Sequence, residues 1–424
     1  MSPTSHARAS AVRLLLAALV LVAFAGCRTA ALPAVPLLPA EARAVPLVLV
    51  SLDGFRPDYR GRGTTPALDL LAAEGVAAAR LVPVFPTLTF PNHHSLVTGL
   101  HPEHHGIVGN TMRDPVLGDF SLGNRAAVAD ARWWGGEPLW VTAERQGARA
   151  ATLFWPGSEA AIGGVRPSDW LPYDEAMPYA ARVDTALAWL GRPAATRPRV
   201  VTLYFEAVDS AGHRFGPDAP ETAAAVARVD SALVRLTAGL ERLGPANVVV
   251  VSDHGMAALA PERVVFLDDA APAFAADAER VIWGATTLVW PAPGRLDALH
   301  AALSTLDHVR VYRRDAPEAA GGVPERLHFR DNPRIAPLVL VADEGWALTT
   351  RADPRTPRGG THGFDVDVPS MAGLFVAHGP AFRSGAAVAE VRTVDVYGVL
   401  CRVLGIVPAP NDGDAAAAGA LLRE

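Results

Sequence analysis

Five short, mainly apolar runs recur along the chain, and they restrict the possible fold more than any other feature. They occupy residues 45–52, 149–154, 199–206, 247–252 and 372–379. A continuous apolar run of this length is typical of a strand that is buried on both faces, as in a parallel sheet covered by helices. Helical patterns lie between several of the runs. The sequence therefore predicts an α/β fold, with a largely parallel sheet and helices on both of its faces.

Two of the intervening segments carry clear helix signals. Residues 222–244 repeat valine and leucine at helical spacing and end on a glycine, which is a common helix terminator. Residues 64–75 place Thr65 where an N-cap is expected and Pro66 at the first helical position. We therefore expect a long helix over the first segment and a short helix over the second.

Residues 262–350 interrupt this alternation. The segment contains three strand patterns and one helix pattern, so we expect a small inserted α+β lobe within a main domain of residues 46–410. Residues 411–424 are rich in aspartate and alanine, and we expect this tail to be loosely held.

The first residues resemble an export signal. Two arginines lie before an apolar run at residues 14–26, which is shorter than the roughly 18 to 20 residues that a membrane span requires. Cys27 follows, as at a bacterial lipoprotein cleavage site. We expect a signal peptide at residues 1–27 and a linker at residues 28–45. The mature protein is then exported in a bacterium, either periplasmic after ordinary cleavage or attached to the membrane by a lipid on Cys27.

The charge composition excludes several functions. All 38 basic residues are arginine, because the sequence contains no lysine. Neither a Schiff-base mechanism nor a P-loop lysine is therefore available. The formal net charge is −6 and no basic block is present, which gives no support for a nucleic-acid-binding patch.

Acidic residues and histidines occur where the predicted core strands end. Functional groups of α/β proteins gather at the carboxyl ends of parallel strands, and three aspartates with three histidines suit two divalent ions of the zinc type. Gly255 would permit the sharp turn that lets Asp253 and His254 reach one ion. Taken singly, a strand-end aspartate is more often a turn or capping residue, and a lone histidine is more often structural. The candidate ligands are Asp53, Asp209, His213, Asp253, His254 and His362.

The stretch from Phe85 to Ser95, FPTLTFPNHHS, offers a nucleophile. Two metal ions can activate a hydroxyl and stabilise a leaving oxygen in line with it. Thr87 and Thr89 are both candidates, because nearby prolines restrain the backbone. The alternative is a helix start with Thr89 or Asn92 as the N-cap. The two interpretations are compatible, since a helix N-terminus also favours a bound anion.

At these residues the chain resembles the nucleotide pyrophosphatase/phosphodiesterase family of the alkaline phosphatase superfamily, in its compact bacterial form. The shared strings are SLDGFRPDY, PTLTFPNHHSLVTGLHPEHHGIVGN, FWPGSE, YFEAVDSAGHRFGP, VVVVSDHGM and GTHGFD, and they occur in the family's order. The resemblance implies an alkaline-phosphatase-like fold, two Zn²⁺ ions and a small nucleotide or other phosphodiester as substrate. It also implies that the five histidines of residues 93–105 are not metal ligands.

The resemblance further implies a role for each site residue. Thr89 is the nucleophile and forms a covalent phospho-enzyme, and Asn110 helps to bind a phosphate oxygen. The first ligand set, which holds one zinc ion, is Asp209, His213 and His362. The second ligand set, toward which Thr89 is directed, is Asp53, Asp253 and His254. The aromatic residues that enclose a nucleobase are Phe90, Tyr173 and Tyr204.

These features predict a two-zinc phosphodiesterase that cleaves nucleotide phosphodiester or phosphoanhydride bonds and releases nucleoside monophosphate. A sulfatase is disfavoured because Phe-Pro-Asn-His follows Thr89, where sulfatases have x-Pro-x-Arg. No arginine lies near Thr89 to bind a monoester dianion as in alkaline phosphatases. Two alternatives stay open: a phosphomonoesterase or choline-type lipid phosphodiesterase on the same site, and an exported binding protein with a vestigial site.

Overall fold

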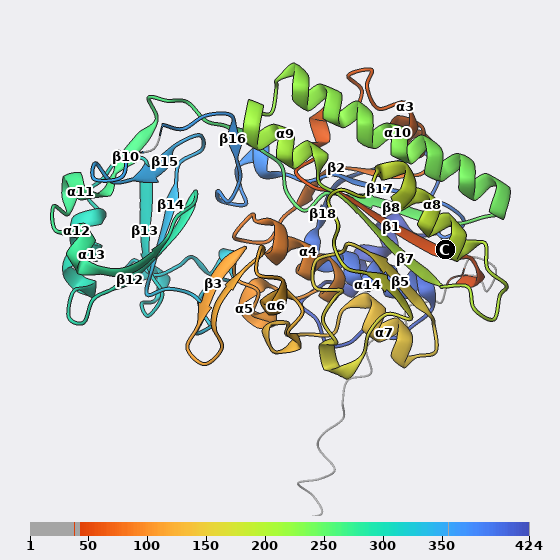
Figure 1. Ribbon diagram of the computed structural model, residues 1–424, viewed down its shortest axis with the longest axis horizontal. Helices are drawn as coiled ribbons and strands as arrows, with labels where there is room; N and C mark the ends of the chain where they lie inside the picture. Colours follow the sequence, from red (N-terminus) through yellow and green to blue (C-terminus); the bar gives the residue numbers. More distant parts are fainter. Residues whose placement is uncertain (1–37, 39–42, 355, 424) are drawn as a thin grey trace, which may run out of the picture. The chain divides into compact units, whose positions relative to one another are not determined.

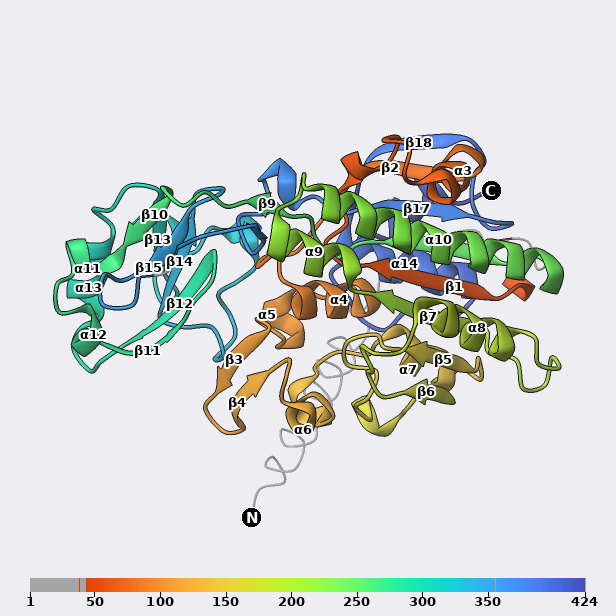
Figure 2. The same cartoon turned by 45° about the horizontal axis from the view of Figure 1, so that its top comes forward.

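The computed structural model describes residues 38, 43–354 and 356–423. The predicted signal peptide and nearly all of the predicted linker lie outside these residues. An eight-stranded sheet forms the centre of the described part, in the order β18-β2-β17-β8-β1-β7-β5-β6. Figure 2 shows these strands from top to bottom, with β8 unlabelled between β17 and β1. The strands are β1 (Leu47–Leu52), β2 (Val76–Val82), β5 (Ala150–Leu153), β6 (Asp169–Leu171), β7 (Val200–Phe205), β8 (Asn247–Val251), β17 (Phe375–His378) and β18 (Ala386–Arg392).

The prediction of a largely parallel sheet is confirmed, and all five predicted strands belong to it. Strands β8, β1, β7, β5 and β6 pair in parallel, and so do β2 and β18. Strand β17 runs antiparallel to both of its neighbours, β2 and β8. An apolar run predicts that a strand is buried but not its direction, so the reversal of β17 was not visible in the sequence.

Helices cover both faces of the sheet (Figure 1). Side chains alternate between the two faces of a strand, and in β1 Leu47 and Leu49 face one core while Val48 and Val50 face the other. The first core contains α4 (Thr89–Thr98), α7 (Leu139–Arg145) and α14 (Thr393–Leu404). The second contains α3 (Pro66–Glu74), α8 (Tyr179–Leu190), α9 (Ala207–Phe215) and α10 (Pro220–Leu243). The two predicted helices are α3 and α10, and both are confirmed. The expected cap of α3 is not, because the Thr65 hydroxyl donates to Asp69 rather than receiving a backbone N–H.

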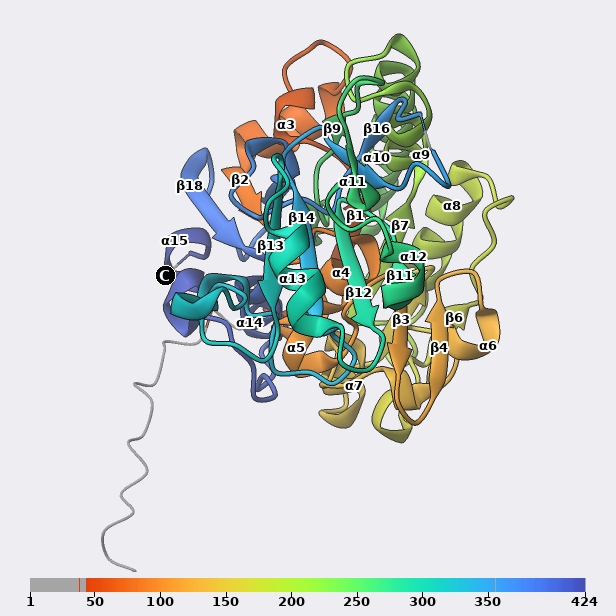
Figure 3. The same ribbon diagram turned by 90° about the vertical axis from the view of Figure 1, so that its left-hand side faces the viewer.

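The strands between β10 and β15 lie outside the central sheet and form a separate lobe, which faces the viewer in Figure 3. Its antiparallel sheet has the order β11-β12-β14-β13, and β10 pairs with β15 beside it. The lobe has a core of its own. Its elements are β10 (Val264–Phe266), α11 (Leu267–Ala270), α12 (Phe274–Asp277), β11 (Ala278–Ile282), β12 (Thr286–Pro291), α13 (Leu296–Leu303), β13 (Val309–Arg313), β14 (Leu338–Ala342) and β15 (Ala347–Thr349).

The C-terminal tail is packed, so the expectation of a loosely held segment was wrong. Leu421 and Leu422 are only 1% and 2% exposed. The carboxylate of Asp412 accepts the backbone N–H of His101 at 2.8 Å. Two leucines at the end of a segment otherwise rich in aspartate and alanine bury enough apolar surface to hold it in place. No helix among the described residues is long and apolar enough to cross a membrane.

Candidate metal centre and nucleophile

The six predicted ligands lie together at the carboxyl end of the central sheet. Four segments supply them: the loop after β1, the loop after β8, the loop after β16 (Gly360–Thr361), and helix α9, which begins directly after β7. In that order the residues are Asp53; Asp253 and His254; His362; Asp209 and His213.

Two glycines allow the ligand loops to approach one another. Gly54 has a φ of +66°, and a Cβ at this position would lie 2.9 Å from the Cα of Asp209. Its N–H donates to Oδ1 of Asp253 at 3.2 Å, so this residue joins three ligand loops. Gly255 does not have a positive φ, and it is needed for close approach instead. A Cβ there would lie 2.1 Å from the carbonyl oxygen of Ser370.

The first ligand set leaves two imidazole lone pairs facing each other. Nδ1 of His213 lies 3.0 Å from the carbonyl oxygen of Gly360, and Nδ1 of His362 lies 2.8 Å from that of Thr87. A carbonyl only accepts, so each Nδ1 carries a proton and each Nε2 carries a lone pair. The two Nε2 atoms are 3.1 Å apart. Oδ1 of Asp209 lies 3.5 and 3.6 Å from them and has no hydrogen-bond partner among the described residues.

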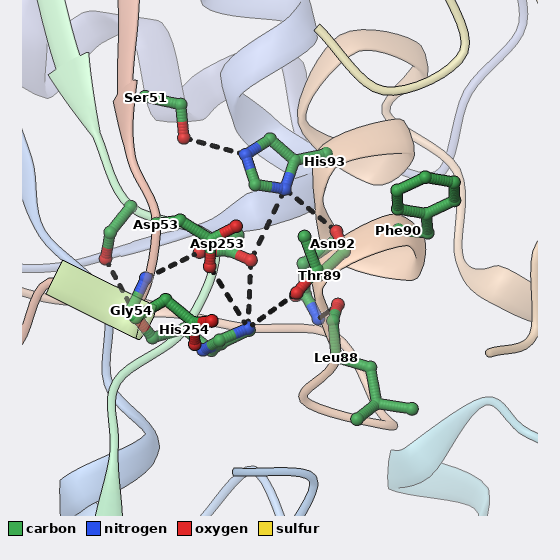
Figure 4. A network of polar contacts seen from close by, with 12 residues as sticks. Ser51, Asp53, Gly54, Leu88, Thr89, Phe90, Asn92, His93, Asp253 and His254 are labelled. Atoms are coloured by element: carbon green, nitrogen blue, oxygen red, sulfur yellow. Dashed lines mark hydrogen bonds and ion pairs between the residues drawn. The ribbon is translucent and has the colours of Figure 1, made fainter. Parts of the chain in front are cut away.

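The second ligand set repeats this arrangement (Figure 4). Nδ1 of His254 lies 2.9 Å from the carbonyl oxygen of Gly255, which places a proton there and directs Nε2 into the cluster. That Nε2 lies 2.9 Å from Oδ2 of Asp253 and 3.7 Å from Oδ1 of Asp53. Within the described part of the chain, neither of these carboxylate oxygens has a hydrogen-bond partner of proper geometry.

Burial and mutual repulsion set the charges of these groups. Burial raises the pKa of Asp53 well above its ordinary value, and the negative charge of Asp253 adds to the effect. Burial also opposes the charge of Asp253, but His254 and His93 outweigh it and hold the pKa well below its usual range. Burial, assisted by His254, lowers the pKa of His362 well below the ordinary value. Buried acceptors of this kind are costly without a cationic partner. A divalent cation at each ligand set fits the donors, whose outer N–H groups bond to carbonyls as metal-binding histidines do.

His93 also lies within reach of the second ligand set, and together with Asp53 and Asp253 it satisfies the distances of a metal site. Its Nδ1 lies 2.8 Å from the carbonyl oxygen of Thr89 and therefore carries a proton. The same Nδ1 is 3.3 Å from Oδ2 of Asp253, and Nε2 lies 2.8 Å from Oγ of Ser51. Because both nitrogens have protein partners, His93 is suited to orient Asp253 and not to bind a metal directly.

The two candidate threonines lie in different environments. The hydroxyl of Thr87 is fully buried, donates to the carbonyl of residue 364 at 3.0 Å and accepts the N–H of Gly363 at 2.9 Å. It therefore holds the loop of the first ligand set. Thr89 is the first residue of α4, and its hydroxyl lies 3.4 Å from Nε2 of His254. Of the two, Thr89 is the one whose hydroxyl faces the cluster.

Helix α4 begins without the expected side-chain cap. Leu88 occupies the N-cap position, and Oδ1 of Asn110 accepts the N–H of Phe90 at 2.8 Å. This contact satisfies one of the free N–H groups of the first turn and leaves the amide NH₂ of Asn110 as a donor. Asn92 has a different role: its side chain accepts the N–H of Val84 at 2.7 Å and donates to carbonyls within residues 84–88.

A cavity of about 220 Å³ adjoins the cluster and is lined in part by the three predicted aromatic residues. Phe90 packs against Phe120 and Trp134, with ring centroids 5.9 Å away in each case. Tyr204 is only 8% exposed, and its hydroxyl donates to Oδ2 of Asp53 at 2.6 Å. Tyr204 is therefore bonded to a member of the second ligand set. Stacking of a nucleobase on these aromatic residues stays a prediction.

Sequence reasoning did not find the residues that support the ligands. Tyr204 and Ser51 lie on buried strands, where a hydroxyl requires a partner. The need of a buried hydroxyl for a partner was the signal in the sequence that could have indicated a supporting role for these residues. The sequence could not identify the partners, because Asp53 and His93 belong to other segments of the chain.

The fold and the cluster define an α/β protein with a candidate metal centre of carboxylate and imidazole donors beside a threonine hydroxyl. Residues 47–365 match the family model of type I phosphodiesterase / nucleotide pyrophosphatase. The chain therefore belongs to this family, and the resemblance noted from the sequence motifs is confirmed.

Curated relatives and solved structures agree with this assignment. The ectonucleotide pyrophosphatase/phosphodiesterase family member 1 of Rattus norvegicus is 36% identical over 408 residues, which cover 92% of this chain and 44% of the relative. The venom phosphodiesterase of Naja atra is 34% identical over 406 residues, covering 89% and 46% of the two chains. The chain thus spans less than half the length of these relatives.

A solved structure of murine ectonucleotide pyrophosphatase/phosphodiesterase 5 superposes with a TM-score of 0.81 and 33% sequence identity, covering 89% of this chain and 100% of the other. That protein is an inactive threonine-to-alanine variant in complex with AMP. The similarity confirms the predicted alkaline-phosphatase-like α/β fold.

Proposed function

We propose that the chain is a two-zinc phosphodiesterase or nucleotide pyrophosphatase that releases nucleoside monophosphate through a covalent phosphothreonine at Thr89. One observation carries the proposal: the Thr89 hydroxyl, at the start of α4, lies 3.4 Å from His254 Nε2, beside buried carboxylate oxygens that have no hydrogen-bond partner among the described residues. The family assignment supports the reaction class. The inactive threonine-to-alanine variant of the murine relative supports a threonine in the reaction.

The donor chemistry favours zinc. Imidazole nitrogen together with carboxylate oxygen suits Zn²⁺, whereas Mg²⁺ and Ca²⁺ prefer oxygen donors alone. The first ligand set would hold one ion and the second ligand set the other. When bound, such ions lower the pKa of a nearby hydroxyl and neutralise negative charge on phosphoryl oxygens.

The reaction then proceeds in two steps on the residues of this chain. The Thr89 hydroxyl loses its proton to solvent and its oxygen forms a bond to phosphorus, while the bond from phosphorus to the leaving oxygen breaks. The electron pair departs with that oxygen, which takes up a proton from solvent when it leaves as an alcohol. Water next attacks the phosphothreonine in line: the water oxygen bonds to phosphorus, the bond from phosphorus to the Thr89 oxygen breaks, and one proton of the water passes to the Thr89 oxygen, which restores the hydroxyl and releases the monophosphate. The NH₂ group of Asn110 donates to a non-bridging phosphate oxygen, and the N-terminus of α4 favours the negative charge.

Phe90 and Tyr173 form the walls of the cavity next to Thr89 and offer flat surfaces for a nucleobase. Binding of AMP by the murine relative supports a nucleotide as the substrate. Export is also part of the proposal, because relatives are named ectoenzymes and a venom enzyme. A periplasmic location, or attachment through a lipid on Cys27, belongs to the same proposal.

The test compares Thr89→Ala with Thr98→Ala on three substrates: a nucleotide diester, p-nitrophenyl phosphate and p-nitrophenylphosphorylcholine. Thr98 lies in the same helix, and its hydroxyl donates to the carbonyl of His94 at 2.7 Å, so this variant controls for loss of a helix hydroxyl. Thr89→Ala should abolish turnover of the diester while the zinc content, measured by mass spectrometry of the purified protein, stays at two. Near-wild-type activity of Thr89→Ala would remove the nucleophile from the proposal. If the wild type prefers p-nitrophenyl phosphate or p-nitrophenylphosphorylcholine by tenfold or more, that compound's class becomes the proposed substrate class instead of the nucleotide diester.

A further inference from the structure

A second cavity, of about 250 Å³, borders the cluster and lies between the inserted lobe and the segments of the main domain that carry Leu88, Asn110 and His362. His213 and His362 of the first ligand set form part of its wall, and the lobe contributes Ile282 and Trp283. It shares no lining residue with the cavity of Phe90 and Tyr173. The site therefore has two separate compartments.

The lobe side of this second cavity is firmly attached to the ligand loops. The hydroxyl of Thr286, at the start of β12, donates to the carbonyl oxygen of Gly363 at 2.6 Å. Gly363 directly follows a ligand of the first set, so the β11–β12 turn and the ligand loop are linked by a buried hydrogen bond. Trp283 lies in that turn and packs against Phe274, with ring centroids 6.2 Å apart. The Trp283 ring is thus packed against the core of the lobe.

The position of the second cavity relative to Thr89 indicates its use, on the basis of the proposed function. An in-line displacement requires the leaving group to depart opposite the attacking oxygen. The Thr89 oxygen lies beside His254 of the second ligand set. The opposite side of the reacting phosphorus would then face the first ligand set, which borders both cavities: Asp209 lines the cavity of Phe90 and Tyr173, whereas His213 and His362 line the second. Because the proposed function places the transferred nucleotide in the cavity of Phe90 and Tyr173, the leaving group would enter the second cavity.

The lining of the second cavity indicates what kind of leaving group it accepts. None of the described residues that line it is an arginine, aspartate or glutamate, and the chain contains no lysine. The nearby arginines of the lobe edge are already paired: Arg280 with Asp119 at 2.9 Å, and Arg113 with Glu279 at 3.8 Å. A pyrophosphate leaving group would find no cationic side chain in the wall to compensate its charge.

We propose that the second cavity is a leaving-group subsite for a flat, uncharged organic group, with Trp283 as the residue that determines this specificity. The substrate class is then a nucleotide diester whose departing alcohol carries an aromatic ring or a nucleobase, in preference to a nucleoside triphosphate. Trp283 supplies an aromatic surface for such a ring, and base–aromatic stacking is worth about tenfold or more in binding.

The experiment uses three substrates that share the thymidine 5′-phosphoryl group: p-nitrophenyl thymidine 5′-monophosphate, the dinucleoside monophosphate of thymidine, and thymidine triphosphate. For each, kcat/KM is measured with the wild type, Trp283→Ala and Tyr173→Ala. In Trp283→Ala, the ratio of kcat/KM for the aryl ester to that for the triphosphate should fall about tenfold, and the dinucleoside should follow the aryl ester. Tyr173→Ala should lower all three values together, because the transferred nucleotide is the same.

A second variant keeps the test decisive if Trp283→Ala does not fold. Ile282→Arg places a cation in the wall of the second cavity and should shift the same ratio toward the triphosphate by about tenfold. A ratio that changes less than twofold in the folded variants would overturn the subsite. If the wild type hydrolyses none of the three substrates, the proposed function itself fails, which is a different result from an unchanged ratio.

Discussion

Removing the hydroxyl of Tyr204 should weaken the metal site without changing any ligand. The hydroxyl donates to Oδ2 of Asp53 at 2.6 Å in a buried environment. A hydrogen bond to a charged group contributes about 1.5–3 kcal/mol, and loss of a supporting contact of this kind costs about 10–100-fold in metal affinity. For Tyr204→Phe we therefore expect a zinc dissociation constant that is 10- to 100-fold higher for the ion held by the second ligand set.

The pH dependence of this effect follows from the charge of Asp53. Burial raises the pKa of Asp53, the charge of Asp253 raises it further, and the bond from Tyr204 lowers it. Tyr204→Phe removes the lowering contribution, so the pKa of Asp53 rises further. A carboxylate must be deprotonated to bind a metal, and the affinity deficit should therefore grow as the pH falls.

Zinc affinity is measured by competition with a chelator of known affinity, at several pH values. Tyr173→Phe is the matched control, since it removes a hydroxyl from the same cavity that does not bond to Asp53. A Tyr204→Phe protein whose zinc affinity stays within twofold of the wild type, or whose loss is matched by Tyr173→Phe, would refute the reasoning.

Three further outcomes follow from the structure. Burial lowers the pKa of His94 to about 4. As the pH falls below about 6.5, this histidine takes up a proton in the unfolded protein but not in the folded protein, so the free energy of unfolding decreases between pH 6.5 and pH 4. In urea unfolding, His94 should account for a decrease of about 3 kcal/mol in the free energy of unfolding by pH 4. The decrease in His94→Gln should be smaller by that amount, and identical pH profiles of the two proteins would contradict this expectation. Removing zinc with a chelator should lower the melting temperature, because zinc at one hundred times its dissociation constant stabilises the folded state by about 2.7 kcal/mol. An unchanged melting temperature would argue against a bound metal. Gly54→Ala should destabilise the protein by at least about 1–2 kcal/mol and reduce its zinc content. The reason is that φ at this position is +66° and the new Cβ would lie 2.9 Å from the Cα of Asp209. A stable variant with its full zinc content would show that the segments of Asp53 and Asp209 can move apart freely.

The sequence predicted the central strands well because their side chains are buried on both faces. Strand β1 is an example: every residue from Leu47 to Leu52 is buried. Partner strands and direction depend on contacts between distant segments, so the reversal of β17 required the structure. The same limit explains the tail, whose stability depends on where Leu421 packs and not on its local composition.

For the site, the sequence indicated which residue types occur at strand ends but not how they are held. The residues of FPTLTFP left both Thr87 and Thr89 as candidates, and the family resemblance pointed to Thr89. The structure separates them by their partners: the Thr87 hydroxyl bonds to the backbone as donor and as acceptor, and the Thr89 hydroxyl faces His254. The contact from Tyr204 to Asp53 joins two neighbouring strands whose pairing no local pattern encodes.

The most direct test of the account is anomalous diffraction from crystals of the purified protein, recorded above and below the zinc absorption edge. We expect two peaks, one enclosed by Asp209, His213 and His362 and one by Asp53, Asp253 and His254, with the Thr89 oxygen beside the second. No peak at either position, or a single peak elsewhere such as beside His101 and His104, would contradict it.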